Sequence, residues 1–111
     1  MSGMTSSRIN NANLTATGRL AKAFVWLWYT IMTETNGAET KRLWCKFDGM
    51  TAAANCLGYG HTMTGVDLTV RDVMRKRALP IFHAAGNQDA RDTWEFDCVT
   101  ELTEALDKIY G

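Results

Sequence analysis

Apolar side chains are concentrated in residues 20–32, LAKAFVWLWYTIM, where Lys22 is the one charged residue. Wound at about 100° per residue, this segment forms two neighbouring apolar stripes. The first stripe holds Leu20, Phe24, Leu27 and Ile31, and the second holds Ala21, Val25, Trp28 and Met32. Together they cover an arc of roughly 160°, which is wider than the stripe of an ordinary surface helix. The pattern predicts a core helix, and the run is shorter than the ~20 residues that cross a membrane.

Trp26 points away from both stripes of this helix, and Tyr29 lies at their edge. One interpretation is that Trp26 lies over the Lys22 stem or is covered by another segment. The other is that it contacts another chain, since Trp and Tyr are enriched among the residues that dominate binding energy at interfaces. Together with Trp44, these two residues form the predicted partner-binding site.

The segment 38–48 joins Leu43, Trp44 and Phe47 on one helical face, although the alternation of Leu43, Cys45 and Phe47 also fits a strand. Composition favours the helix.

Glycines are expected to separate the helices, because glycine is common just past a helix end. Asn36-Gly37 is predicted to end the first helix, and Asp48-Gly49 to end the second. The Ala-rich segment 51–57 is then a short helix of its own, closed by Gly58.

Another amphipathic helix is predicted over 69–79. Thr69 followed by Asp72 resembles a capping box that opens it, and Pro80 is expected to kink or stop it.

A last helix of about 18 residues is predicted over 93–110, capped by Asp92 or Thr93. Its apolar arc comprises Trp94, Cys98, Val99, Leu102, Ala105, Leu106 and Ile109. Only Glu95, in the first turn, intrudes on this arc.

These elements predict an all-α fold, a small single-domain bundle of four to five helices. The alternative is an α+β fold with a short two-stranded sheet from 42–48 and 94–98. Residues 1–13 are rich in Ser and Asn and are expected to be a flexible lead-in to a helical domain over 14–111.

The formal net charge is zero, but the charges are unevenly distributed along the chain. Residues 1–91 hold eleven basic and six acidic side chains (+5), whereas residues 92–111 hold one and six (−5). Zero net charge disfavours a general nucleic-acid coat or an acidic DNA mimic, since each needs a strong net field. The odd number of cysteines, three, and the lack of a signal-peptide pattern favour the cytoplasm.

A metal site would have to draw on irregularly spaced ligands, namely Cys45, Cys56, His61, His83 and Cys98. Structural zinc sites usually bring their ligands in close pairs, so no metal is expected. The glycines of 58–65, GYGHTMTG, match no phosphate-binding motif. No cofactor and no catalytic residue is predicted.

The basic residues of the 69–79 helix are Arg71, Arg75, Lys76 and Arg77, which could contact nucleic acid or an acidic partner. A helix-turn-helix needs a turn of about three to four residues, whereas roughly ten separate this helix from the preceding one. Nucleic-acid binding is therefore expected to be weak or absent.

A compact, neutral, Trp- and Met-rich domain without enzymatic motifs resembles, in overall character, the small accessory proteins of phages and mobile elements. Anti-CRISPR inhibitors are among them. The resemblance implies a non-catalytic protein-binding domain that inhibits a host protein or complex in the host cytoplasm. A homodimer with the first helix at or near its interface is expected, because two-fold dimers are the commonest way to cover a surplus apolar surface. The alternative is a small DNA-binding regulator that uses the 69–79 helix.

Overall fold

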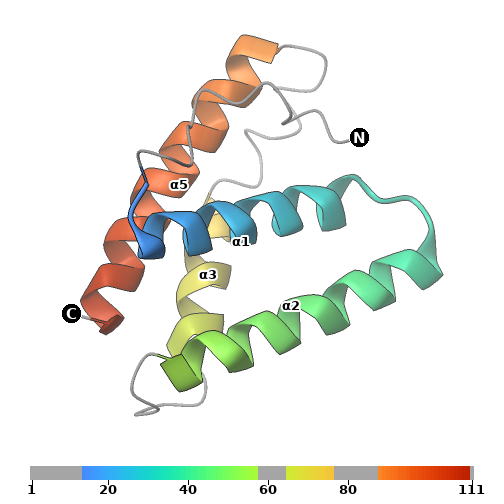
Figure 1. Ribbon diagram of the computed structural model, residues 1–111. Helices are drawn as coiled ribbons and strands as arrows, with labels where there is room; N and C mark the ends of the chain where they lie inside the picture. The colour runs from blue at the N-terminus through green and yellow to red at the C-terminus, as the bar shows by residue number, and fades with distance from the viewer. Residues whose placement is uncertain (1–13, 58–64, 77–87, 111) are drawn as a thin grey trace.

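The computed structural model describes residues 14–57, 65–76 and 88–110 (Figure 1). They form four helices, which are α1 (Ala16–Thr33), α2 (Gly37–Leu57), α3 (Gly65–Lys76) and α5 (Gln88–Tyr110). The described residues contain no strand, since 42–48 lies inside α2 and 94–98 inside α5. The predicted all-α bundle is confirmed, and the α+β alternative is wrong. The predicted lead-in over 1–13 lies outside the described residues.

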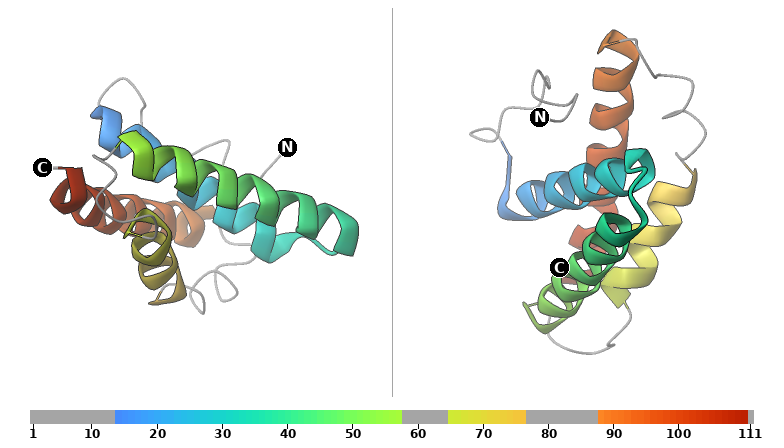
Figure 2. Two further views of the ribbon diagram at one scale, coloured as in Figure 1. Left: turned by 90° about the horizontal axis from the view of Figure 1, so that it is seen from below. Right: turned by 90° about the vertical axis from the view of Figure 1, so that its right-hand side faces the viewer.

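Helix α1 packs against α2, α3 and α5 (Figures 1 and 2). Helix α3 in turn packs against both α2 and α5. The buried hydrophobic residues of α1 are Ala21, Phe24, Val25, Leu27, Trp28 and Ile31, while Leu20 and Met32 are partly buried. Both predicted stripes are therefore core, and neighbouring helices of the same chain cover them.

The other helices contribute one apolar face each to the same core. Helix α5 buries Trp94, Cys98, Val99, Leu102 and Leu106, which are all members of its predicted arc. At its end, the Tyr110 hydroxyl donates to the Ala54 carbonyl at 3.0 Å, and burial raises the pKa of this phenol. This bond ties the C-terminal turn of α5 to α2.

Side-chain caps set the beginnings of α1 and α2. Thr15 Oγ1 accepts from the Gly18 amide at 3.0 Å, and Asn36 Oδ1 accepts from the Glu39 amide at 3.0 Å. Asn36-Gly37 was predicted to end the first helix, but α1 ends at Thr33 and Asn36 caps α2. A short polar side chain that is followed three residues later by Glu is typical of a helix start.

Helix α3 begins four residues before the predicted cap at Thr69, so that Thr69 and Asp72 lie within the helix. The reason is a contact from α2, because Asn55 Oδ1 accepts from the buried Val66 amide at 2.9 Å. A side chain from another helix thus satisfies an amide of the first turn. The predicted end of this helix at residues 77–79 and Pro80 lie outside the described residues.

Helix α5 begins at Gln88, so Asp92 and Thr93 are not its cap. Asp92 is only 8% exposed and sits in the second turn. The prediction placed the start too late because the apolar arc begins only at Trp94.

Helix α2 continues through Gly49, where the sequence predicted a break between two helices. Glycine costs about 1 kcal/mol relative to alanine inside a helix. Phe47 and Ala54 are buried on either side of this position, and their burial holds the helix together across it. Gly49 itself is exposed, and a Cβ placed there would meet nothing within 4 Å.

Gly49→Ala should therefore stabilise the protein by about 0.5–1 kcal/mol, because alanine loses less backbone entropy on folding. Urea unfolding would measure the gain. Gly18→Ala is the matched control, since its Cβ would lie 3.3 Å from Leu14 Cβ and from Thr15 Oγ1. The gain there should be smaller or absent, and an equal gain at both positions would contradict the assignment of Gly49 to an open helix face.

Candidate functional site

Trp26 is held on the outer arc of α1 by a carboxylate from α5. Its indole Nε1 donates to Glu95 Oε2 at 3.0 Å, and Glu95 is only 1% exposed. A buried carboxylate is costly unless it is hydrogen-bonded, so this contact stabilises both partners. It also explains why a Glu interrupts the apolar arc of α5.

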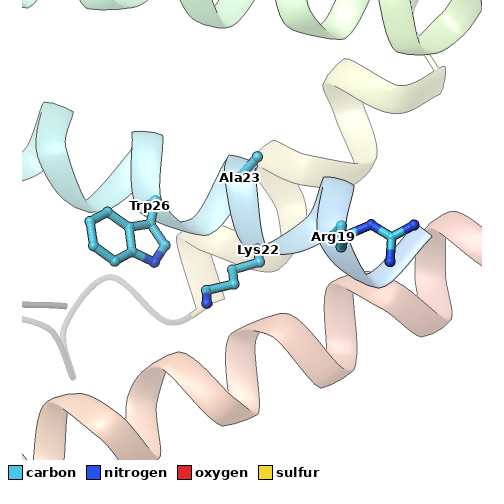
Figure 3. A pocket seen from close by; sticks show the side chains of 4 residues that line it. All are labelled: Arg19, Lys22, Ala23 and Trp26. Carbon is cyan, nitrogen blue, oxygen red and sulfur yellow. The ribbon is translucent and has the colours of Figure 1, made fainter. Parts of the chain in front are cut away.

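Two neighbouring hollows share Trp26 and Ala23 as walls, and we call them together the Trp26 groove. The first, of about 290 Å³, is lined by Arg19, Lys22, Ala23 and Trp26 (Figure 3). The second, of about 400 Å³, lies between α1 and α2 and is lined by Ala23, Trp26, Leu27, Thr30, Leu43, Lys46 and Met50.

Three cations, Arg19, Lys22 and Lys46, border the groove, and none of its described lining residues is an Asp or Glu. In Figure 3 the Lys22 side chain extends toward the indole of Trp26, whereas Ala23 points to the other side of α1. Arg19 Nη1 donates to the Leu14 carbonyl at 3.0 Å, which holds this guanidinium at the start of the helix. The groove therefore combines an apolar floor with a positive rim.

Tyr29 and Trp44, the two other predicted partner-binding residues, do not line this groove. The Tyr29 ring packs against Trp94 at a centroid distance of 6.0 Å. The Trp44 ring contacts Trp28 and Phe47 edge-on at 5.6 and 5.5 Å. Both are partly buried against the core, and only Trp26 lies in the groove.

The predicted basic helix is α3, and its first cation is engaged within the fold. The Arg71 guanidinium lies 5.2 Å from the Trp44 ring and 5.0 Å from the Phe47 ring. Its Nε donates to Asp67 Oδ1 at 2.7 Å, and its Nη2 lies 3.7 Å from Asp48 Oδ1.

The remaining cations of this helix are less buried. Lys76 Nζ lies 3.4 Å from Glu101 Oε2 on α5, and Arg75 is exposed. Arg77 lies outside the described residues. Carboxylates from α2, α3 and α5 thus pair with two of the three described cations of this helix, Arg71 and Lys76.

In the described parts of the chain, no group of three or more His, Cys, Asp or Glu side chains could hold a metal ion. Cys45 and Cys56 are exposed and Cys98 is buried. His61 and His83 lie outside the described residues, as does the glycine-rich segment up to residue 64. Among the described helices, none is long and apolar enough to cross a membrane.

Sequence reasoning missed most of the groove, namely Arg19, Ala23, Lys46 and Met50, as well as the role of Glu95. One local signal was present, because Lys22 and Trp26 are four residues apart and so lie on one face of a helix. The part contributed by α2 had no such signal, since it depends on how α2 packs beside α1.

Comparison of this chain with protein-family models, with curated proteins and with solved structures finds no match.

The Trp26–Glu95 contact should couple the two residues energetically. Trp26→Phe removes the indole N–H that donates to the buried Glu95 carboxylate, which should cost about 1.5–3 kcal/mol of unfolding free energy, the usual contribution of a hydrogen bond to a charged group. A double-mutant cycle with Glu95→Leu, measured by urea unfolding, should give a coupling of about 0.5–3 kcal/mol. Additive effects of the two substitutions would refute the contact.

Arg71 and Arg75 should respond differently to truncation. Arg71→Ala should lower the unfolding free energy by about 1–2 kcal/mol, because it removes two aromatic contacts and two carboxylate partners. Arg75→Ala should change it by no more than about 0.5 kcal/mol, as is usual for an exposed side chain. Equal urea midpoints for the two variants would mean that Arg71 has no structural role.

Proposed function

We propose that this protein is a non-catalytic protein-binding domain that captures an acidic segment of a partner protein in the Trp26 groove. The observation that carries the proposal is the combination of a fixed aromatic ring, an apolar floor and a positive rim in one groove.

The electrostatics of the groove favour a negatively charged partner. Arg19, Lys22 and Lys46 border it, while the Glu95 carboxylate that holds Trp26 is buried. Opposite charge across an interface accelerates association and excludes partners of the wrong sign. The apolar floor then favours a partner segment that carries hydrophobic side chains among its acidic ones.

Trp26 is suited to dominate the binding energy at this surface. Its indole nitrogen is already engaged by Glu95, so the ring is held in place before a partner arrives. A residue that is ordered in advance loses little conformational entropy on binding. Tryptophan is also the residue type most enriched among interface hot spots.

A protein of this kind acts by occupying a surface, as an inhibitor or adaptor. This is the mode of action of the phage and mobile-element accessory proteins that the chain resembles in character, and we propose a host protein or complex as the partner. We propose the host cytoplasm as its compartment, since the exposed thiols of Cys45 and Cys56 suit a reducing environment.

Affinity capture from host lysate with three immobilised proteins tests the proposal. Ala23→Glu places a carboxylate in the groove at an exposed helix position, and Ala53→Glu makes the same change on the exposed face of α2. After nuclease treatment, the parent and Ala53→Glu should retain the same protein, and Ala23→Glu should lose it. Elution should follow increasing salt, because the attraction between exposed charges is screened.

Two outcomes would overturn the proposal. The first is that the captured proteins are the same for all three baits. The second is that capture disappears with nuclease treatment, which would identify nucleic acid as the ligand and favour the regulator that the sequence offered as an alternative.

A further inference from the structure

A second surface of the molecule has the opposite character to the Trp26 groove. Phe96 on α5 is 53% exposed, and in the described residues only Leu68 on α3 is a comparably exposed large apolar side chain. The residues that share its helix face are also exposed, namely Asp89, Thr93, Thr100, Glu104 and Asp107. At about 100° per residue, these six positions fall within an arc of roughly 80°. We call this surface the Phe96 face.

The Phe96 face matches what the groove is expected to bind. It presents one aromatic ring among three carboxylates, Asp89, Glu104 and Asp107, and the rest of its face is Thr. The groove presents an apolar floor within a rim of three cations. The two surfaces thus carry opposite charge, with three cations around one and three carboxylates on the other.

The groove is in contact with α5, because Glu95 reaches across from α5 to Trp26. Phe96, the next residue along the chain, points to a different side of α5 and is exposed. One molecule therefore carries both halves of the match without joining them. In an isologous two-fold dimer, the Phe96 face of each copy would pair with the groove of the other.

We infer that a second copy of this chain occupies the Trp26 groove through its Phe96 face, forming a two-fold dimer with two equivalent contacts. The inference rests on the proposed function, because it uses the same groove. It adds a form of regulation, since each groove that is filled by the second copy is closed to an acidic segment of another protein.

Sedimentation velocity of the full chain tests the inference over a range of protein concentrations. At low salt the mass should rise with concentration toward twice the 12.4 kDa of one chain. Raising the ionic strength from about 0.05 to 0.5 M should weaken association, because the Debye length shortens below the spacing of exposed charges. A mass of one chain at every concentration would overturn the inference.

Single substitutions locate the contact. Phe96→Ser removes the exposed ring, and Ala23→Glu blocks the groove; each should weaken self-association at least about tenfold, as loss of an interface hot spot does. Leu68→Ser and Ala53→Glu are the matched controls, which make the same changes outside both surfaces. A dimer that is insensitive to Phe96→Ser and Ala23→Glu, or one that is broken by the controls, would overturn the inference.

Mixing two defective variants gives the sharpest test. Phe96→Ser keeps an intact groove, and Ala23→Glu keeps an intact Phe96 face. The pair should form a heterodimer with one complete contact, at concentrations where each variant alone is monomeric. Failure of the mixture to associate would refute the pairing of these two surfaces.

The lysate experiment separates this inference from the proposed function. If the parent is monomeric and still captures a protein through the groove, the dimer is refuted and the proposed function stands. If the parent dimerises through Phe96 and Ala23 but captures no protein through the groove, the dimer stands and the proposed function fails. If both hold, monomeric Phe96→Ser should capture more partner than the parent at the same concentration, because its grooves are open.

Discussion

The whole arrangement depends on covering an unusually wide apolar arc on α1. Both apolar stripes of α1 must be shielded from water, and a single neighbouring helix can cover only one of them. Helices α2 and α5 therefore pack on different sides of α1, and α3 closes the bundle by contacting both of them (Figure 1). Only a narrow strip of α1 remains at the surface, and this strip carries Arg19, Lys22, Ala23 and Trp26. The groove is thus a consequence of how the core is closed.

Polar contacts decide the register in which these helices meet. Glu95 is buried against Trp26, and Asn55 is buried against the first turn of α3. A buried polar group that loses its partner is costly, so each contact disfavours any shift of one helix along another. The Arg71 guanidinium acts similarly between α2 and α3, because it contacts both the Asp48 and Asp67 carboxylates and the Trp44 and Phe47 rings. Packing of apolar side chains alone would tolerate more alternatives than these directional contacts do.

Positive charge predominates over residues 1–91 and negative charge over residues 92–111. Some of these charges form ion pairs within the fold, as where Lys76 of α3 lies beside Glu101 of α5. Other charges stand beside apolar side chains, with three cations around the Trp26 groove and three carboxylates on the Phe96 face. A chain with zero net charge can thus carry local surfaces of opposite sign.

The sequence by itself determined the helical class, because the 3.6-residue periodicity of α1 and α5 is a local property of the chain. It also identified the core residues of both helices and marked Trp26 as lying off the apolar stripes. Helix boundaries were less accessible, since the start of α3 depends on Asn55 and the continuity of α2 through Gly49 depends on burial of Phe47 and Ala54. The tertiary structure alone decided that Arg71 is structural, that Glu95 holds Trp26, and that Lys46 and Met50 complete the groove. Each of these arrangements depends on residues that are distant in sequence, and no local sequence pattern predicts which distant side chains will be in contact.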